Sequence, residues 1–174
     1  MPCHVLEVAS GTGQHGAYFA QQLAGLSWQP TDLTDEHFGS IEAWRQPVAQ
    51  AVRAPILLDA TAEDWPSVGA DAIFCSNMIH IAPFEATLGL LRGAGSVLPV
   101  GGPLVLYGPF RQQGGHTAPS NAAFDSSLKA RDPRWGVRDL DEVVALAARQ
   151  GLHLDQIVVM SANNLTVVLR RGSP

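Results

Sequence analysis

The fold is decided by one stretch of sequence, Val5-Leu6-Glu7-Val8-Ala9-Ser10-Gly11-Thr12-Gly13-Gln14-His15-Gly16. It reads as an apolar strand with one acid, followed by a glycine-rich turn and a helix. Gly11 and Gly13 allow the turn a positive φ and let a ligand touch bare backbone, and the helix aims its first amides at that ligand. We therefore expect a nucleotide-type cofactor at this turn. Gly16 completes the G-x-G-x-x-G lettering of dinucleotide-binding proteins, which is weak evidence by itself.

The acid in this stretch, Glu7, changes which cofactor we expect. A carboxylate at the end of the strand is expected to face the ligand, where it meets an ammonium or hydroxyl group and repels the pyrophosphate of a dinucleotide. S-adenosylmethionine (SAM) carries an amino group and a ribose, so we predict it as the cofactor. The alternative is a glycine-rich turn that only connects a strand to a helix.

Length and composition indicate one domain over residues 1–174, because 46% hydrophobic content is enough for a packed core. A formal charge of −5 without any Lys/Arg run argues against nucleic acid and acidic membranes as partners. No apolar stretch approaches the roughly 18 residues of a membrane span, and the start, Met1-Pro2-Cys3-His4, lacks the features of a signal peptide, so we expect a cytoplasmic protein. Cys3 and Cys75 are expected to lie too far apart for a disulfide. We also expect no metal, and the sequence leaves the oligomeric state open.

Apolar runs of strand length alternate with helical segments, which predicts a parallel α/β sheet. The expected strands are 4–9, 28–31, 55–58, 70–76 and 103–107. The expected helices are 15–23, 35–51 after a Thr34 or Asp35 cap, 83–98, and 139–150 with Asp139 as its cap and Glu142 three residues on. Two β-branched runs, 156–160 and 165–169, read as an antiparallel hairpin, which departs from the all-parallel dinucleotide fold.

The stretch 108–138 shows little periodicity and is rich in Gly, Pro, Ser, Asn, Gln and Arg. Long irregular segments in compact domains are usually functional, so we expect a loop here that covers the substrate. Within it, Asn121 and Asp125 stand four residues apart, on one face if that part is helical, and are candidates to orient a polar substrate. The alternative for both is a loop network that satisfies itself.

Polar residues follow the expected strands at their carboxyl ends, where ligands bind in open α/β sheets. Asp32 stands where a carboxylate accepts hydrogen bonds from both ribose hydroxyls, or else lies in a turn or caps a helix. Asp59 is placed to accept from an adenine amino group, or else caps the segment after it. Met78 is placed against the adenine or the methyl-donor end, or else belongs to the core.

Methyl transfer from a sulfonium is an in-line displacement that needs positioning and, for some acceptors, removal of a proton. His80 is the first candidate for a base because imidazole titrates near neutrality, and a histidine that only packs locally is the alternative. With Asn121 and Asp125 it forms the predicted catalytic set. Tyr107, Trp135 and Arg138 are the candidates for substrate contact. Trp135 can instead anchor the loop to the core, and Arg138 can instead pair with a neighbouring acid.

Segments along essentially the whole chain carry a resemblance to a known family. They are residues 5–15, Trp28-Gln29-Pro30-Thr31-Asp32, Asn77-Met78-Ile79-His80, Tyr107-Gly108-Pro109-Phe110, Ser120-Asn121, Phe124-Asp125, Pro133-Arg134-Trp135-Gly136-Val137-Arg138-Asp139 and Ala162-Asn163-Asn164. Through them the chain resembles the class I SAM-dependent methyltransferases, and more closely the methyltransferase-like protein 26 family. The resemblance implies a Rossmann-like sheet of seven strands with the last antiparallel and helices on both faces. It also implies SAM contacts at Glu7, Ala9, Ser10, Gly11, Thr12, Gly13, Asp32, Leu33, Asp59, Ala60, Asn77 and Met78.

Two features depart from the family pattern. Ala9 stands where the general pattern has its first glycine, which is a small change. The sequence also begins almost at the first strand, whereas family members carry a helical stretch before it, so we expect a truncated sequence, a misassigned start or a more open and weaker site. The expected function is methyl transfer to a small molecule. A methyltransferase-like protein that binds without turnover is the alternative, and an NAD-dependent oxidoreductase is a distant third.

Overall fold

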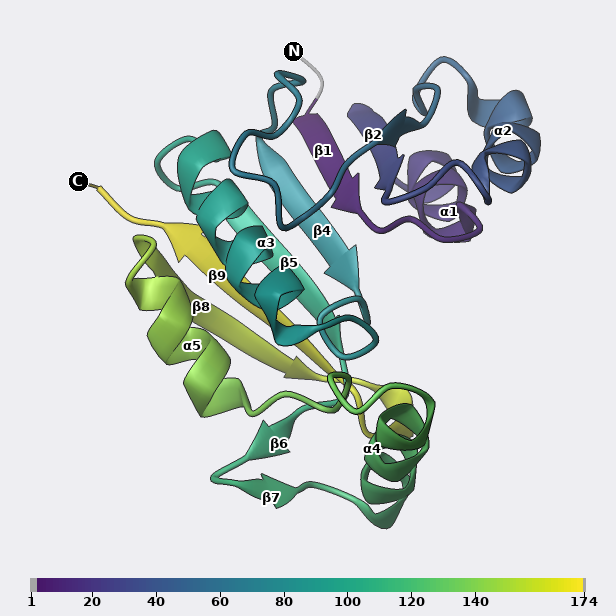
Figure 1. Cartoon of the computed structure of the whole chain (residues 1–174). Coiled ribbons are helices and arrows are strands. Elements are labelled where there is room, and N and C mark those ends of the chain that lie inside the picture. Colours follow the sequence, from purple (N-terminus) through teal and green to yellow (C-terminus); the bar gives the residue numbers. More distant parts are fainter. Residues whose placement is uncertain (1–2, 174) are drawn as a thin grey trace.

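A seven-stranded sheet forms the centre of the computed structural model, which describes residues 3–173 (Figure 1). Its strand order is β3-β2-β1-β4-β5-β9-β8. The strands are β1 (Cys3–Val8), β2 (Leu26–Asp32), β3 (Ile56–Leu57), β4 (Ala72–Ser76), β5 (Pro103–Gly108), β8 (Leu152–Val159) and β9 (Leu165–Arg171). β1 to β5 pair in parallel, whereas β9 runs antiparallel to both β5 and β8. The expected α/β fold with a closing hairpin is confirmed. The start, Met1–Pro2, where we expected no signal peptide, lies outside the described residues.

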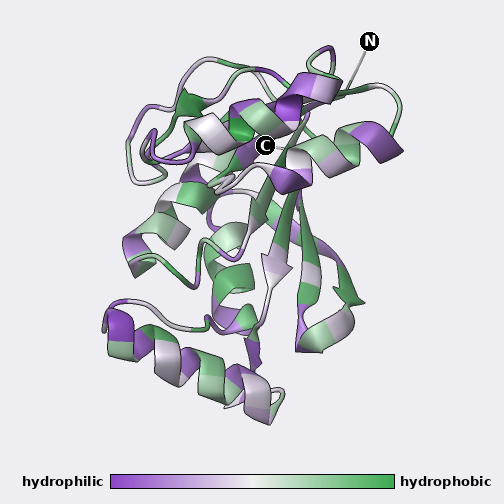
Figure 2. Ribbon diagram, turned by 90° about the vertical axis from the view of Figure 1, so that its right-hand side faces the viewer, coloured by the Kyte–Doolittle hydropathy of each residue, from purple (hydrophilic) through white to green (hydrophobic). Residues whose placement is uncertain are grey.

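Helices cover both faces of the sheet, as expected. They are α1 (Gln14–Gln22), α2 (Phe38–Arg45), α3 (Phe84–Val97), α4 (Pro119–Arg131) and α5 (Leu140–Ala148), with short 3-10 turns at Gln46–Val48 and Ser161–Asn163. Side chains alternate along β1, so Leu6 packs in the core beneath α3 and α5, whereas Val5 packs on the opposite face with Ala17 of α1. Figure 1 shows α3 and α5 side by side over one face. In Figure 2 the strands are mostly in the hydrophobic colour and the helices are mixed, as buried sheets and amphipathic helices require.

The second expected helix is shorter in the structure than in the sequence analysis. α2 ends at Arg45 and tightens into a 3-10 turn that contains Pro47. Proline has no N–H to donate and its ring clashes with the preceding turn, so it stops the α-helix there. The N-cap is His37 instead of the expected Thr34 or Asp35. The last helix, α5, starts as expected, because the Asp139 side chain accepts a hydrogen bond from the Asp141 amide at 3.0 Å.

The stretch 108–138 is not the irregular loop that we expected. It contains a small hairpin, β6 (Arg111–Gln112) and β7 (Gly115–His116), followed by the whole of α4. The buried positions of α4 are Asn121, Asp125 and Leu128, which have helical spacing. Two of these three are polar, so a search for apolar periodicity could not reveal the helix. Figure 1 shows β6, β7 and α4 together at one end of the molecule, below the sheet.

Two further expectations concern absences. Cys3 and Cys75 are both free, and Cys75 pairs in register with Val8, at the opposite end of β1 from Cys3. Between residues 3 and 173 no helix has both the length and the apolar character needed to cross a bilayer.

Candidate functional site

A cavity of about 250 Å³ lies at the carboxyl ends of β1 to β4 and the first turn of α3. We call it the β1–β4 slot, and its lining residues are Val8, Ala9, Leu33, Leu58, Asp59, Ala60, Thr61, Met78, Ala82, Pro83 and Ala86. Five of the residues predicted to bind the cofactor meet here, namely Ala9, Leu33, Asp59, Ala60 and Met78. Its position is where ligands bind in open parallel sheets.

The glycine-rich turn beside the slot has the backbone that the sequence predicted. Gly11 has φ 54° and Gly13 has φ 89°, and Ala9 also lies in the left-handed region at φ 60°. The Gly11 amide donates to Oδ2 of Asp32 at 2.8 Å, while Oδ1 of Asp32 accepts from the Leu33 amide at 2.8 Å. Asp32 therefore joins the turn after β1 to the end of β2. Each of its oxygens retains a lone pair for a further donor.

The three glycines of the fingerprint meet different surroundings. A Cβ on Gly13 would lie 2.9 Å from Cα of Ile41 on α2, and a Cβ on Gly16 would lie 2.6 Å from Cδ1 of Trp28 on β2. No described atom lies within 4 Å of the place where a Gly11 Cβ would be. Gly13 and Gly16 thus serve the packing of α1, and Gly11 alone borders open space.

Glu7 does not face the slot, so the predicted role for it is wrong. Its side chain is 1% exposed, and Oε2 accepts hydrogen bonds from Oγ of Ser10 and from Nε1 of Trp28, both at 2.8 Å. Oε1 has no hydrogen-bond partner among the described residues and lies 3.6 Å from Nδ1 of His15. The interaction with Glu7 raises the pKa of His15, although partial burial of the ring opposes the shift. Glu7 therefore anchors the turn from within the protein.

The remaining turn residues, Ser10 and Thr12, also act within the protein. Oγ of Ser10 accepts from the Thr31 amide at 3.1 Å, and the carbonyl of Thr12 accepts from Ser40 Oγ at 2.9 Å. These bonds tie the turn to β2 and α2. Their side chains do not line the slot.

The far wall of the slot is built by Asp59 and the start of α3. Oδ1 of Asp59 accepts from the amide of Thr61 at 2.8 Å and from its hydroxyl at 2.7 Å, which is the capping role that we gave as the alternative. Among residues 3–173, Oδ2 accepts no side-chain or main-chain hydrogen bond, so it stays available. α3 approaches closely because Gly89 has no side chain, and a Cβ there would fall against the carbonyl of Ala60.

Six lining residues were not predicted from the sequence, namely Val8, Leu58, Thr61, Ala82, Pro83 and Ala86. A signal for part of this wall was present. Ala86, Gly89 and Gly93 are small residues at helical spacing, and a Cβ on Gly93 would fall against the ring of Trp65. Such a face indicates a helix that approaches the chain segment after β3 at short range.

Asn77 and Met78 follow β4 and remain next to the slot. Met78 is 7% exposed and lines the slot, so it belongs to the core and is also available for contact with a ligand. Asn77 has φ 60°, a strained conformation for a residue with a side chain. Its Oδ1 lies beside the end of β5, 3.0 Å from where a Cβ on Gly108 would be.

His80 is not placed as the general base that we predicted. It is fully buried, and Nδ1 accepts a hydrogen bond from the Arg138 amide at 3.1 Å. Burial and the positive charge of Arg138 lower the pKa of His80 to about 3, so the ring is neutral at physiological pH. Its Nε2 has no described partner and lies against Gly108. The alternative interpretation, a histidine that packs and bonds locally, describes this geometry.

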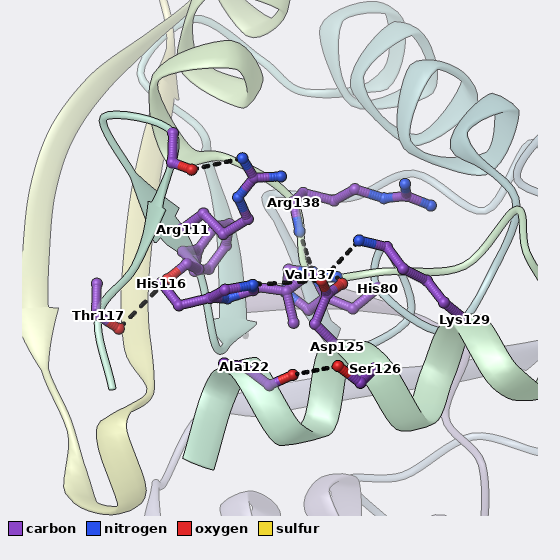
Figure 3. A network of polar contacts seen from close by, with 12 residues as sticks. His80, Arg111, His116, Thr117, Ala122, Asp125, Ser126, Lys129, Val137 and Arg138 are labelled. Atoms are coloured by element: carbon purple, nitrogen blue, oxygen red, sulfur yellow. Dashed lines mark hydrogen bonds and ion pairs between the residues drawn. The ribbon is translucent and has the colours of Figure 1, made fainter. Parts of the chain in front are cut away.

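Asn121 and Asp125 hold α4 in place, and Figure 3 shows the contacts of Asp125. Oδ1 of Asp125 accepts from the Val137 amide at 2.8 Å, and Oδ2 contacts Nζ of Lys129 at 2.6 Å and Nε2 of His116 at 3.3 Å. Burial acts to raise the Asp125 pKa, but the hydrogen bonds from Lys129 and Val137 outweigh it and leave the pKa below its ordinary value.

Asn121 makes the other attachment of α4. It donates through Nδ2 to the carbonyl of Asn163, at 3.0 Å, and to Oγ1 of Thr117. Asn121 and Asp125 therefore form the self-satisfied network that the sequence analysis left as the alternative.

The three residues predicted to contact substrate lie apart. Arg138 donates to main-chain carbonyls instead of pairing with an acid, and Trp135 stacks with Arg131, whose Cζ lies 5.4 Å from the ring centre. Tyr107 accepts at its hydroxyl from Nδ2 of Asn164 at 3.0 Å. Its ring lines a separate apolar hollow of about 550 Å³ on the α1 side of the sheet, together with Phe74.

A second small hollow, of about 250 Å³, lies between α4 and the turn that joins β8 to β9. We call it the α4 hollow, and its lining residues are Pro109, Ser120, Asn121, Phe124, Ala162 and Asn164. All six are uncharged. It adjoins the end of β5, whose Tyr107 carbonyl accepts from the Asn77 amide at 2.8 Å. Among residues 3–173 no group of three or more His, Cys, Asp or Glu side chains is arranged to hold a metal ion.

Solved structures share this fold at low sequence identity. The mitomycin 7-O-methyltransferase MmcR matches with a TM-score of 0.85 and 17% identity, over 98% of this chain and 49% of its own. An O-methyltransferase family 2 protein from Planctomyces limnophilus DSM 3776, in complex with apigenin, matches with a TM-score of 0.83 and 20% identity, over 96% of this chain and 50% of its own. PigF with SAH matches with a TM-score of 0.80 and 16% identity, over 96% and 50%.

The similarity to these structures shows a shared Rossmann-like α/β fold. The chain spans about half the length of each of them. A family model matches residues 2–171, which is nearly the whole sequence. The chain therefore belongs to the family described as protein of unknown function DUF938.

Proposed function

We propose that this chain binds SAM in the β1–β4 slot and transfers its methyl group to a small molecule. The observation that carries the proposal is the slot, which gathers Ala9, Leu33, Asp59 and Met78 from four strand ends into one cavity. Asp32 directly precedes Leu33 and holds the glycine turn. We also propose that this chain is related to the methyltransferase-like protein 26 family.

The residues of the slot suit the adenosine part of SAM. Leu58, Met78 and Ala86 provide apolar walls for a flat base, and the free Oδ2 of Asp59 is an acceptor for an amino group. Asp32 offers one unused lone pair on each oxygen to the two hydroxyls of a ribose. The open space beside Gly11 leaves room for the remaining part of the cofactor against bare backbone.

Glu7 does not discriminate against a dinucleotide, because its carboxylate is buried away from the slot. Two other observations favour SAM. The antiparallel β8–β9 hairpin closes the sheet, in contrast to the all-parallel dinucleotide fold. Two structures similar to this chain are O-methyltransferases by name, and a third contains SAH.

SAM, when bound, supplies a methyl group on a positively charged sulfonium. The residues of this chain then have to bind and orient both partners in line and keep water out. Among the described residues, Asp59 is the one titratable side chain that lines the slot, and His80 is neutral and buried. The α4 hollow is our candidate for the acceptor, because it adjoins the end of β5 next to Asn77 and its uncharged lining suits a small neutral molecule.

A second function, cofactor binding without turnover, is favoured by the state of His80. A base that must accept a proton near neutral pH needs a pKa close to that pH, and the pKa of His80 is about 3. Methyl transfer needs no general base when the acceptor is already deprotonated or loses its proton to water. A site that only positions its reactants can still methylate such acceptors.

Isothermal titration calorimetry with S-adenosylhomocysteine (SAH), SAM and NAD tests the cofactor. We expect micromolar binding of SAH and SAM and none of NAD. SAH at one hundred times its dissociation constant should stabilise the fold by about 2.7 kcal/mol. Binding of NAD without any heat from SAH or SAM would overturn the proposal.

Two exposed leucines provide a matched pair of variants for the position of the site. Leu33, 63% exposed, lines the slot, and Leu23, 52% exposed, lines the apolar hollow on the α1 side. We expect Leu33→Ala to weaken SAH binding by about 1 kcal/mol, because the smaller alanine side chain covers less of the ligand and leaves more of its apolar surface exposed to water. Leu23→Ala should bind as the wild type does. The reverse result would move the cofactor to the other hollow.

A further inference from the structure

Arg138 holds the turn that leads from β4 to α3. Its Nε donates to the carbonyl of Ile79 at 2.8 Å, and its Nη2 donates to the carbonyl of Ala82 at 2.7 Å and of Arg134 at 3.1 Å. Cζ lies 5.3 Å from the centre of the Phe84 ring, at the first residue of α3. One guanidinium therefore contacts both ends of the segment 79–84.

The main chain around Arg138 makes the same connection. The Gly136 amide donates to the carbonyl of His80 at 2.9 Å, and the Arg138 amide donates to Nδ1 of the same histidine at 3.1 Å. Between them the Val137 amide donates to Oδ1 of Asp125 on α4 (Figure 3). Residues 136–138 thus join α4 to the turn after β4.

This turn is also a wall of the β1–β4 slot, because Met78 precedes it and Ala82 and Pro83 end it. We propose that Arg138 is a positioning residue for the slot, which sets the place of the turn 79–82 and links occupancy of the slot to the attachment of α4. The inference rests on the proposed function in that the ligand of the slot is SAM or SAH. It replaces the predicted role of Arg138 in contacting substrate.

An arginine suits this task better than a lysine. The planar guanidinium presents donors in a fixed fork, so it can hold the carbonyls of Ile79 and Ala82 at once. An ammonium group is a compact donor on a flexible stem and fixes the distance between two acceptors less well. The ring of Phe84 on one side adds a favourable contact for a cation.

The test compares Arg138→Gln and Arg138→Lys with Arg134→Gln as a matched control. The Arg134 side chain bonds only to Asp132, among the described residues, and lies in solvent four residues away. By calorimetry we expect Arg138→Gln to weaken SAH binding by about tenfold, within the range known for residues that couple to a site without touching the ligand. The SAH affinity of Arg138→Lys should lie between that of Arg138→Gln and that of the wild type. Arg134→Gln should bind SAH as the wild type does.

Two further readouts separate positioning from a general loss of stability. In Arg138→Ala, added guanidinium ion at millimolar concentration should restore part of the SAH affinity, and it should have no effect on the wild type. Without any ligand, hydrogen exchange at the amides of His80 and Ile81, which bond to the Asn77 carbonyl, should be faster in Arg138→Gln than in Arg134→Gln.

Unchanged SAH affinity in Arg138→Gln would overturn the inference while leaving the proposed function intact. If the wild type binds no SAH, the proposed function fails, and the hydrogen-exchange comparison still decides whether Arg138 holds the turn. Equal exchange rates in the two variants would overturn that part.

Discussion

Alanine should act mainly on ligand binding at Gly11 and mainly on stability at Gly13, although both glycines lie in the left-handed region. That conformation destabilises the folded state by about 1–2 kcal/mol for a residue with a side chain. Alanine also lowers the conformational entropy of the unfolded chain, which stabilises the folded state by about 0.4–1 kcal/mol. For Gly11→Ala we therefore expect a net loss of about 1 kcal/mol in the free energy of unfolding, because the new Cβ enters open space.

Gly13→Ala carries a further cost. Its Cβ would lie 2.9 Å from Cα and from Cγ1 of Ile41, a residue that is 1% exposed and belongs to a helix, so α2 must shift. Overpacking of this kind costs about 1–3 kcal/mol, which brings the total to about 2–4 kcal/mol. A domain with a typical stability of about 5–15 kcal/mol still folds, with a much lower urea midpoint.

Urea unfolding at 25 °C, followed by fluorescence and circular dichroism, measures the two losses, and calorimetry with SAH measures binding. We expect Gly11→Ala to fold almost as the wild type does and to lose at least most of its SAH affinity, because the methyl occupies the place of the ligand. Equal stability losses in the two variants would refute the packing argument for Gly13. Full SAH affinity in Gly11→Ala would refute the assignment of the open space.

Three other outcomes can be checked with the same assays. Asp32→Ala should weaken SAH binding by about 1–3 kcal/mol through the loss of charged hydrogen bonds, and wild-type affinity in the folded variant would place the ribose elsewhere. Ala9→Gly should raise the free energy of unfolding by about 0.5–1 kcal/mol, because glycine adopts φ 60° without strain, and a loss of stability would contradict this. The pKa of His80 falls from 6.5 to about 3 on folding. Between these two pH values the unfolded chain therefore binds a proton at His80 that the folded chain does not bind. Stability supplied by the neutral ring should thus be lost by about 1.4 kcal/mol per pH unit between about pH 6 and pH 4, and His80→Asn should show a shallower slope by that amount. His15, whose pKa is raised, contributes with the opposite sign in both proteins and cancels in the comparison; identical slopes would show that His80 does not titrate as described.

The sequence predicted the strands well because their side chains form buried apolar runs. It also predicted the β8–β9 hairpin, which the β-branched residues indicate. α4 escaped detection because Asn121 and Asp125 occupy its buried positions, and a helix buried by polar contacts has no apolar period.

The errors at the site have a common cause, which is that the partners are distant in sequence. Glu7 shares the face of β1 with Val5, so strand alternation already turns it toward Trp28, but only the register between β1 and β2 shows that Trp28 is there to receive it. His80 is buried because residues 136–138 cross it, a contact over more than fifty positions that no local pattern encodes. Where neighbours along the chain suffice, as at Asp139, the sequence gives the correct cap.

The polar attachment of α4 has a thermodynamic consequence. Leu128 is the one apolar side chain among its buried residues, and Asn121 and Asp125 supply the remaining anchorage through a few directed bonds. Release of such a helix exposes little apolar surface, so it carries only a small change in heat capacity, whereas unfolding of the sheet and its helices carries a large positive one. The free energy that holds α4 therefore varies almost linearly with temperature, while that of the core is curved and weakens on cooling. Warming should detach α4 before the sheet melts. Because this release changes the heat capacity so little, a calorimetric scan should hardly detect the loss of order at the end of the molecule that carries the α4 hollow.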